Sequence, residues 1–344
     1  MRRIAAVLVG LALLAIAAPA FAEDVQPPPA GSWAEAQIEA VVAAGLMAPS
    51  AEEFRPDDPL TRAELMPVLT ALTGQEQALP EPDRLVTMRE LDARLVRSLG
   101  LAPAAKQIRA AVGAAGLRPP ARLGTETVAR LLILRFNHPA DQDYLELLPG
   151  DPATRAEAAF SIARILDLRA QETDFQWVND LAATMTLPAP TDWQRAVLTR
   201  AVRFVGYPYV WGGTSEREET PFEITARGGF DCSGFVWRVF NTQPFADAPL
   251  LAETLKGRST YEMSAEEPEG ERIPLESLQP GDLLFFGLNG PQSKPEEIVH
   301  AGVYLGGGWF AHSSRYGTTL TPLTNWYATS FAWGRRLLFE AGLQ

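Results

Sequence analysis

The spacing of apolar residues changes once along the chain, and this change restricts the folds that the sequence can adopt. From Gly31 to about Leu168, apolar residues recur at the intervals of three and four that are typical of amphipathic helices. From about Asp192 onward, one or two helices are followed by short stretches in which apolar and polar residues alternate, as in half-buried strands. The sequence therefore predicts an all-α region followed by an α+β region. The helical spacing predicts helices over residues 33–46, 62–72, 88–99, 105–117 and 127–136.

Composition along the chain suggests where these regions begin and end. We expect a helical domain at residues 31–170, a linker at 171–191 that ends in Leu-Pro-Ala-Pro, and a second domain at 192–344. Residues 23–30 are acidic and rich in proline, so we expect them to form a tether without regular structure.

Residues 1–22 have the pattern of a secretory signal peptide. Arg2 and Arg3 precede an apolar run from Ile4 to Ala18, and Ala20-Phe21-Ala22 provides a small-residue cleavage site. The alternative, an N-terminal membrane anchor, is disfavoured because the apolar run is too short. We therefore expect a secreted protein of the periplasm or of the cell envelope and cell wall, without a membrane span after cleavage.

Charge and cysteine content exclude several classes of protein. The formal net charge of −12 becomes −14 once the two leader arginines are removed, so we expect no non-specific binding to nucleic acid or anionic lipid. A single cysteine excludes an intramolecular disulfide, an iron–sulfur cluster and a cysteine-rich zinc site. The acidic clusters at 57–58 and 216–219 lack the spacing of a calcium loop. We therefore expect no metal and no other cofactor.

The single cysteine, Cys232, lies in the segment Gly-Phe-Asp-Cys-Ser-Gly-Phe-Val-Trp at 229–237. Apolar residues at 235, 236, 239 and 240 form a helical stripe, which predicts that Cys232 lies at a helix N-terminus. The free amides and the dipole at such a terminus favour a thiolate and can hold the oxyanion of a tetrahedral intermediate. This context disfavours the alternative of an inert buried thiol, so Cys232 is predicted to be a nucleophile.

A thiol nucleophile needs a base, and the chain contains three histidines. His138 lies in an Asn-His-Pro turn between helices, so we predict that it is a loop residue without a catalytic role. His300 and His312 lie in two strand-like segments. We predict that His300 is the general base and that His312 orients it and stabilises its imidazolium form.

The loop between the two strands decides whether these histidines can meet. If the triple glycine at 306–308 forms the loop, His312 lies opposite Gly302 and shares one face of the hairpin with His300. A two-residue loop at 307–308 would shift the register by one residue and place His312 on the other face. The three-residue loop is therefore the register that the predicted triad requires.

Several segments of the second region, in the same order, resemble the NlpC/P60 family of cysteine peptidases. The segments are Tyr207–Gly213, Phe230–Phe235, Leu278–Phe286, His300–Gly306 and Ala311–Ser313. The resemblance extends over about residues 194–338. It implies a papain-like α+β fold with a Cys–His–polar triad, and hydrolysis of γ-D-glutamyl–diamino acid bonds in the stem peptides of peptidoglycan.

The same resemblance implies roles for residues beside the nucleophile. Tyr209 would approach Cys232 from the preceding loop, and Asp231 and Ser233 would help to bind the stem peptide. Asp231 can also cap the helix, and the two roles are compatible.

Three further features of the second region are less specific. We expect Trp211 and Trp237 in the core, and Arg258 either at the edge of the cleft or on the surface. The segment 214–229 is longer than in many family members and acidic at its start, so we expect it to border the cleft.

The helical region contains a repeated motif. Pro56–Glu64 returns as Pro149–Glu157, and in each copy a threonine precedes a glutamate by three positions, which is the signature of a helix-capping box. Together with Trp33 and Gly45-Leu46, the first copy resembles the S-layer homology (SLH) module.

The SLH resemblance implies binding of secondary cell-wall polymer. In that family the arginine of the Thr-Arg-Ala-Glu element meets anionic sugar groups, a role that falls on Arg62 and Arg155 here. The alternative is that both arginines pair with nearby glutamates at the start of their helices.

The sequence as a whole predicts an exported cell-wall hydrolase that cleaves an amide bond in peptidoglycan stem peptides. One alternative is an amidase or acyltransferase that uses the same triad on another substrate, because a triad sets the reaction type and the pocket sets the substrate. The other alternative is a non-catalytic wall-binding protein, which the retention of Cys232, both strand histidines and Tyr209 disfavours.

Overall fold

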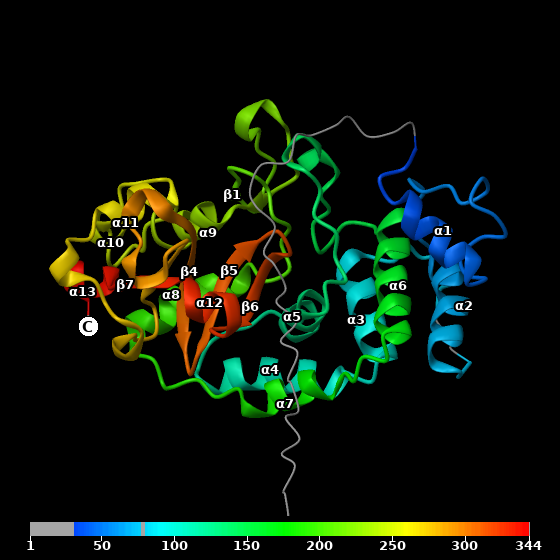
Figure 1. Ribbon diagram of the computed structural model, residues 1–344, viewed down its shortest axis with the longest axis horizontal. Coiled ribbons are helices and arrows are strands. Elements are labelled where there is room, and N and C mark those ends of the chain that lie inside the picture. Colours follow the sequence, from blue (N-terminus) through cyan, green and yellow to red (C-terminus); the bar gives the residue numbers. More distant parts are fainter. Residues whose placement is uncertain (1–30, 77–79, 344) are drawn as a thin grey trace, which may run out of the picture.

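The computed structural model describes residues 31–76 and 80–343. The predicted signal peptide and tether lie outside this range. A helical region and an α+β region lie side by side, and α4, α5 and α7 run along the boundary between them (Figure 1). None of the helices in the described part of the chain has the length and apolar character that a membrane span requires.

The described residues of the helical region form six α-helices and one 3-10 turn. They are α1 (Glu35–Ala43), α2 (Arg62–Thr73), α3 (Met88–Ser98), α4 (Ala102–Ala114), α5 (Leu123–Leu131), η1 (Ala140–Leu145) and α6 (Arg155–Ala170). The five predicted helices are present, but α5 begins four residues earlier than expected and stops at Leu131. It stops because Ile133 has a left-handed backbone conformation, with φ at 58°.

The segment predicted to be a linker contains a helix, α7 (Gln176–Thr184). This helix packs against α4 and buries Val178 and Ala182. The predicted linker at 171–191 therefore includes a helix, and its proline-rich end begins only after α7.

Three extended segments close a ring of hydrogen bonds inside the helical region. The amide of Leu60 donates to the carbonyl of Ala153, that of Ala153 to Val86, and that of Val86 to Leu60, each at 2.8 Å. Each segment leads into a helix whose N-cap threonine accepts a hydrogen bond from the glutamate amide three positions on. The described residues of this region therefore include three repeats of this motif, and the middle one at 82–90, where Met88 stands in the place of the arginine, was not predicted.

The second region is built on a five-stranded antiparallel sheet with strand order β6-β5-β4-β3-β7. Its strands are β3 (Leu283–Gly287), β4 (Ile298–Gly306), β5 (Trp309–Ser314), β6 (Gly317–Pro322) and β7 (Phe331–Arg335). A separate two-stranded ladder pairs β1 (Thr214–Ser215) with β2 (Gly229–Phe230). The helices are α8 (Asp192–Arg203), α9 (Cys232–Phe240), α10 (Leu250–Thr254), α11 (Thr260–Ala265), α12 (Asn325–Ser330) and α13 (Leu337–Glu340). These elements confirm the predicted α+β class.

The two faces of the sheet are covered by different helices. Side chains alternate along each strand, so Phe285 joins the core under α9 whereas Phe286 lies on the opposite face with Phe310 and Tyr327 of α12. The two strand histidines lie on the face that α12 covers.

The β4–β5 hairpin has the predicted register around the histidines but a different turn. Val303 pairs with Ala311 and Tyr304 with Phe310, which is the register that places His312 beside Gly302. At the turn, however, Gly306 pairs with Trp309 across a register shift, so the predicted three-residue loop was wrong. The shift restores the register that a two-residue loop alone would change.

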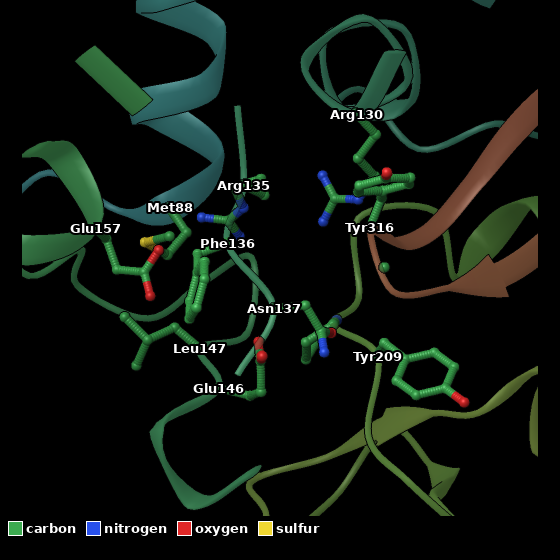
Figure 2. A pocket seen from close by; sticks show the side chains of 12 residues that line it. Met88, Arg130, Arg135, Phe136, Asn137, Glu146, Leu147, Glu157, Tyr209 and Tyr316 are labelled. Atoms are coloured by element: carbon green, nitrogen blue, oxygen red, sulfur yellow. The ribbon is translucent and has the colours of Figure 1, made fainter. Parts of the chain in front are cut away.

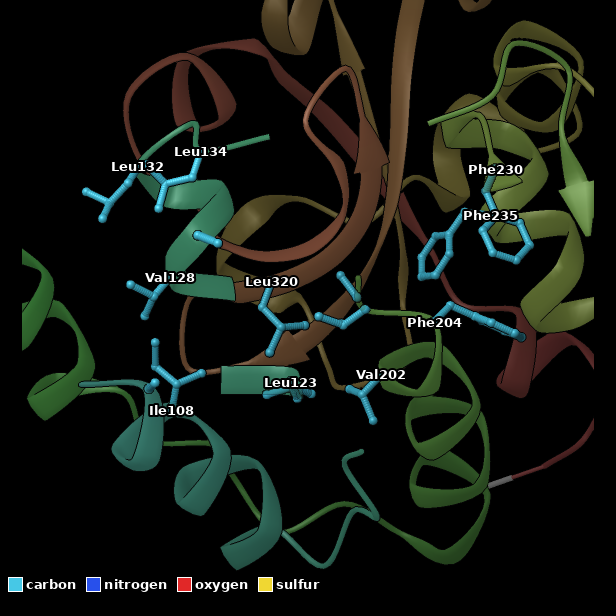
Figure 3. Packing of buried hydrophobic residues seen from close by; sticks show 14 of the residues in the cluster. Ile108, Leu123, Val128, Leu132, Leu134, Val202, Phe204, Phe230, Phe235 and Leu320 are labelled. Atoms are coloured by element: carbon cyan, nitrogen blue, oxygen red, sulfur yellow. The ribbon is translucent and has the colours of Figure 1, made fainter. Parts of the chain in front are cut away.

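One continuous hydrophobic core extends through both regions. Leu123 and Val128 of α5 approach Leu320 of β6, and Val202 and Phe204 lie between this helix and the phenylalanines of β2 and α9 (Figure 3). The helical region is therefore packed directly against the region that contains Cys232.

Candidate active site

Cys232 is the first residue of α9, as predicted, and its side chain is partly exposed. The N-cap of this helix is Asp231, whose Oδ1 accepts hydrogen bonds from the amide of Gly234 and from the Ser233 hydroxyl, the latter at 2.9 Å. A side chain at position 234 would collide with the carbonyl of Gly213, so glycine is required for α9 to approach that loop. The Asp-Cys-Ser-Gly motif thus fixes the start of the helix at Cys232.

The surroundings of Cys232 favour its neutral thiol. The pKa of Cys232 is raised to about 12, mainly by burial and in addition by the negative charge of Asp231. Hydrogen bonds from the amides of Ala301, Ser233 and Cys232 itself act in the opposite direction but are outweighed. The sequence-based expectation of a thiolate at rest is therefore not met, because desolvation exceeds the stabilisation that the helix N-terminus provides.

His300 lies next to the amide that contacts the sulfur, and it is paired with His312. Its Nε2 lies 2.8 Å from Nδ1 of His312, and the two rings are nearly perpendicular at 87°. A Cβ at position 302 would lie 3.2 Å from Cβ of His312, so Gly302 provides the space in which the histidines meet. Burial lowers the pKa of His300 to about 4 and holds that of His312 well below its usual value.

Thr321 extends this pair into a chain of three side chains. The second ring nitrogen of His312, Nε2, lies 2.8 Å from Oγ1 of Thr321 on β6. If His312 Nε2 donates to this hydroxyl, Nδ1 accepts from His300 Nε2–H, and His300 Nδ1 keeps a lone pair free. The sequence analysis did not identify Thr321, because its place beside His312 depends on the register of β6, for which the sequence contained no signal.

Aromatic side chains enclose the two histidines. Between ring centroids, Tyr327 lies 5.9 Å from His300 and 5.2 Å from His312, and Phe310 lies 4.6 Å from His312. The ring centroid of Trp326 lies 6.4 Å from that of His300, and Trp326 remains 39% exposed. This apolar enclosure is the physical reason for the depressed pKa values of the two histidines.

A polar network lies on the other side of Cys232. Arg258 donates to the Ser233 hydroxyl at 2.7 Å and to the carbonyl of Gly212 at 2.9 Å, and it lies 3.5 Å from Asp231. Asp231 Oδ2 also accepts a hydrogen bond of 3.0 Å from the amide of Gly212. Of the two positions considered for Arg258, the structure supports the one at the active site.

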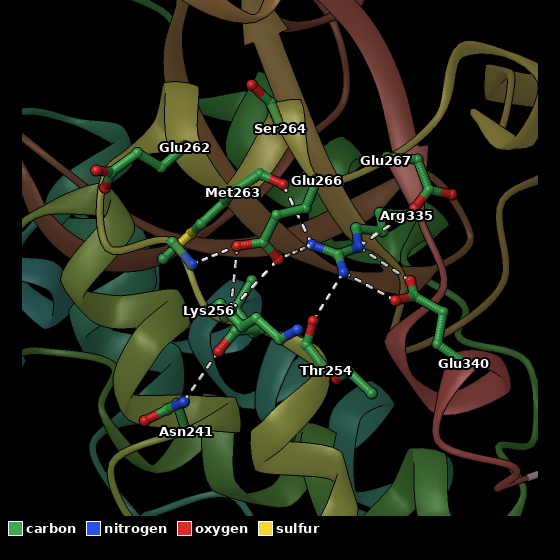
Figure 4. Close-up of polar contacts among 12 residues, drawn as sticks. Asn241, Thr254, Lys256, Glu262, Met263, Ser264, Glu266, Glu267, Arg335 and Glu340 are labelled. Carbon is green, nitrogen blue, oxygen red and sulfur yellow. Dashed lines mark hydrogen bonds and ion pairs between the residues drawn. The ribbon is translucent and has the colours of Figure 1, made fainter.

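The loop that carries Arg258 is supported from β7. Arg335 is buried and contacts Glu266 at 2.7 Å and Glu340 at 2.8 Å (Figure 4). Glu266 in turn accepts hydrogen bonds from the amides of Lys256 and Gly257, directly before Arg258. The network beside Cys232 is thus connected to the end of the sheet.

Tyr209 lies in the loop before β1, within electrostatic range of Cys232. Burial raises its pKa, and the charges of Cys232, Asp231 and Asp143 add to that effect, so its hydroxyl stays protonated at any working pH. A small cavity of about 10 Å³ separates its loop from the helical region and is lined by Arg130, Arg135 and Asn137, among others (Figure 2). Such a cavity has room for about one water molecule.

Of the two tryptophans expected in the core, one is exposed. Trp211 is 55% exposed, so its predicted place in the core was wrong, whereas Trp237 packs partly buried against the core. In the segment 214–229, Glu216 pairs with Arg238 of α9 at 2.8 Å, so this carboxylate binds the loop to the helix and is not free to bind a ligand.

Arg62 and Arg155 are buried inside the helical region, with 8% and 2% of their surface exposed. Arg62 bonds Glu90 of the next repeat at 3.0 Å, and Arg155 bonds Glu64 at 2.6 Å and the carbonyl of Phe54 at 2.6 Å. The structure therefore supports the alternative in which these arginines pair with glutamates, here between repeats, and leaves few donors for an external polymer.

The predicted loop residue His138 is also buried, with its ring 4.7 Å from Trp33 and its Nε2 3.4 Å from Glu157. It lies in the helical region and takes no part in the Cys232 site. Across residues 31–76 and 80–343, no group of three or more His, Cys, Asp or Glu side chains is arranged to hold a metal ion.

Two family models match the chain. Residues 206–336 match the NlpC/P60 family, and residues 29–66 match the S-layer homology domain. The first match includes Cys232, His300 and His312, and the second includes Arg62.

Curated relatives are similar to the second region. The gamma-D-glutamyl-L-lysine dipeptidyl-peptidase of Bacillus subtilis (strain 168) is 31% identical over 121 residues, which are 35% of this chain and 32% of the relative. The bifunctional muramidase/DL-endopeptidase CwlT of the same organism is 31% identical over 139 residues, which are 40% of this chain and 34% of the relative. The matched part thus spans about a third of each relative.

Among solved structures, an NlpC/P60 family protein from Bacillus cereus ATCC 10987 is 26% identical. The match covers 45% of this chain and 43% of that chain, with a TM-score of 0.31.

Proposed function

We propose that the NlpC/P60 domain of this chain is a cysteine peptidase that cleaves the γ-D-glutamyl–diamino acid bond in peptidoglycan stem peptides. The observation that carries the proposal is the arrangement of Cys232 at a helix N-terminus, with its sulfur against the amide of Ala301, and of His300 and His312 at 2.8 Å. The names of the curated relatives, a gamma-D-glutamyl-L-lysine dipeptidyl-peptidase and a DL-endopeptidase, support the choice of bond.

The reaction begins from a neutral thiol and a neutral imidazole. His300 Nδ1 takes the proton of the Cys232 thiol as the sulfur attacks the carbonyl carbon of the γ-glutamyl group, and the imidazolium that forms is stabilised by the lone pair of His312 Nδ1. Because both groups are desolvated, the thiolate forms only while it attacks and does not accumulate at rest.

The oxyanion of the tetrahedral intermediate lies at the N-terminus of α9, where the amide of Cys232 is a donor. His300 then returns its proton to the leaving amine of the diamino acid as the carbon–nitrogen bond breaks. Water, deprotonated by His300, hydrolyses the acyl-enzyme and releases the γ-glutamyl carboxylate and the free Cys232 thiol.

The polar network on the other side of Cys232 suits the acyl part of the substrate. Arg258 has a side chain that is 34% exposed, and it carries the fixed positive charge beside the nucleophile. A γ-linked D-glutamate keeps its α-carboxylate free, so we assign that carboxylate to Arg258 and the remaining polar contacts to Ser233 and Tyr209. The leaving amine lies on the opposite side, near His300 and Trp326.

We further propose that the protein is exported and acts in the cell envelope, where the SLH unit associates with cell-wall polymer. The match to the S-layer homology domain and the leader-like residues 1–22 support this location. Arg62 and Arg155 act in joining the repeats, so any contact with polymer falls on other side chains of the helical region.

Defined peptides test the proposed bond. The full chain is incubated with γ-D-glutamyl-L-lysine and γ-D-glutamyl–diaminopimelate peptides, with the α-linked isomers as controls, and the products are separated by chromatography. Cleavage of the γ-linked peptides that disappears in Cys232→Ala and His300→Ala supports the proposal. Cleavage of neither γ-linked peptide, or equal cleavage of the α-linked isomers, refutes it in favour of an acyl-transfer enzyme with another substrate.

A further inference from the structure

A carboxylate of the helical region contacts the loop that carries Tyr209. Asp143 lies in the turn η1, is 2% exposed, and accepts a hydrogen bond of 2.8 Å at Oδ2 from the backbone amide of Trp211. Trp211 follows Tyr209 by two residues. The bond therefore links the substrate-binding loop to a part of the chain that lies 68 positions earlier.

The next amide of this loop is held by a carboxylate from the opposite side. The amide of Gly212 donates at 3.0 Å to Oδ2 of Asp231, and Asp231 is the residue directly before Cys232. Two consecutive amides are thus bound by carboxylates of the two regions, and hydrogen bonds to carboxylates are stronger than those between neutral groups. The loop is fixed between Asp143 and Asp231.

Two arginines of the helical region hold the chain just before the loop. Arg122 donates to the carbonyls of Arg203 and Val205, and Arg130 donates to the carbonyl of Gly206, all at 2.8 Å. All three acceptors are backbone atoms, so these contacts position the main chain that leads to Tyr209.

Both carboxylates and Cys232 act electrostatically on the Tyr209 hydroxyl. Its hydroxyl lies within electrostatic range of Cys232, Asp231 and Asp143, each of which raises its pKa further after burial has done so. A displacement of the loop therefore moves Tyr209 relative to Cys232. Arg130 and Tyr209 line the same small cavity between the two regions (Figure 2).

We propose that Asp143 is a positioning residue of the cleavage reaction: by binding the Trp211 amide, the helical region holds Tyr209 in the place from which it contacts the substrate beside Cys232. The inference rests on the proposed function. It gives the helical region a part in the reaction that is separate from any binding of wall polymer.

Variants at one turn of the full chain test the inference kinetically. Asp143→Ala removes the acceptor, Asp143→Asn keeps an amide oxygen that can accept the same hydrogen bond, and Asp141→Ala changes an exposed carboxylate of the same turn. With a γ-D-glutamyl-L-lysine peptide, Asp143→Ala should raise KM about tenfold, the size of effect expected for one charge-assisted hydrogen bond. The effect falls on KM because kcat depends on the cysteine and histidines, which other elements position.

The KM of Asp143→Asn should stay within about threefold of that of the unmodified chain, because the hydrogen bond is retained. The KM of Asp141→Ala should equal that of the unmodified chain, because Asp141 does not make this hydrogen bond. In a Tyr209→Ala background, Asp143→Ala should have no further effect, because the two changes then act on one contact. An unchanged KM in Asp143→Ala, or a full tenfold effect that persists without Tyr209, would overturn the inference.

Amide exchange tests the same hydrogen bond without turnover. Labelling with ¹⁵N-tryptophan gives signals from eight tryptophans, among them Trp211 and, as an internal reference, Trp237 in α9. Exchange of the Trp211 amide should accelerate at least about tenfold in Asp143→Ala and not in Asp141→Ala, since one protecting bond is lost. Equal protection in both variants overturns the inference, whereas absence of cleavage by the unmodified chain overturns the proposed function.

Discussion

Replacement of His312 by alanine perturbs the contact on which the proposed base depends. His312 is 1% exposed, its Nδ1 lies 2.8 Å from Nε2 of His300, and its Nε2 lies 2.8 Å from the Thr321 hydroxyl; in the proposed tautomer Nδ1 accepts from His300. Alanine removes the acceptor and leaves the His300 N–H facing a small apolar space between Phe310 and Tyr327. His300 then has no group that selects its tautomer.

The loss in rate follows from the loss of that selection. An imidazole base contributes about 10²–10⁴-fold to the rate, and most of this contribution is lost when the imidazole is in the wrong tautomer. We therefore expect kcat for the γ-glutamyl peptide to fall about 10³-fold in His312→Ala. A buried donor without a partner also destabilises the fold by about 1–3 kcal/mol, and the lost ring contacts add about 1–2 kcal/mol.

Two variants separate these effects. His312→Asn places an amide oxygen near the position of Nδ1 and should recover at least about tenfold of the lost rate, because the tautomer is again selected. His138→Ala removes a histidine that is buried equally but lies in the helical region, so stability should fall while kcat per folded molecule is unchanged. The assay combines urea unfolding with initial rates at saturating substrate. A His312→Ala variant that remains folded and keeps kcat within about threefold of the unmodified chain would refute the role of His312.

Three further predictions follow from burial and charge. Because burial raises the pKa of Cys232 to about 12, its alkylation by iodoacetamide should still accelerate above about pH 9, and a plateau there, as expected for an ordinary thiol with a pKa of about 8.5, would contradict the neutral resting state. Because burial lowers the pKa of His300 to about 4 and holds that of His312 well below its usual value, the unfolded chain binds protons that the native state does not, so urea stability should be lost as the pH falls from about 6.5 toward 4. That loss should be smaller in the double variant His300→Gln, His312→Gln, and an equal loss would show that other groups cause it. Arg155→Ala should lower the free energy of unfolding by about 3–5 kcal/mol because it leaves partners buried between two repeats, whereas the exposed control Arg55→Ala should change it by under about 0.5 kcal/mol; equal effects would refute the role of Arg155 in joining repeats.

Local sequence patterns predicted those parts of the fold that local interactions determine. The helix at Cys232, the cap at Asp231 and the shared face of His300 and His312 all follow from periodicity and side-chain alternation within one or two elements. The hairpin turn was predicted less well, because a register shift at its end is compatible with the same run of glycines. The predicted shared face of His300 and His312 was unaffected, since the strand pairing beside the histidines is the predicted one.

Contacts between distant segments could not be predicted from the sequence. Thr321 and Tyr327 reach the histidines through the packing of β6 and α12, which no periodicity encodes. The resting state of Cys232 was mispredicted for a related reason: the helix N-terminus is visible in the sequence, whereas the desolvation that opposes it depends on what covers the site.

The middle repeat and the environment of the two arginines were likewise not predictable from local sequence patterns. The repeat at 82–90 has the Thr-x-x-Glu pattern but was not predicted, and Met88 stands where the other two repeats have an arginine. Whether Arg62 and Arg155 face solvent or a neighbouring repeat depends on closure of the three segments, which is a tertiary property.

The central claim is that Cys232 cleaves the stem peptide after γ-D-glutamate, and mass spectrometry of digested peptidoglycan tests it most directly. Purified peptidoglycan is incubated with the full chain or with Cys232→Ser, and the released fragments are weighed. Fragments whose masses correspond to a cut between γ-D-glutamate and the diamino acid should be present with the unmodified chain and absent with Cys232→Ser. Fragments from a different bond, or the same fragments with Cys232→Ser, would contradict it.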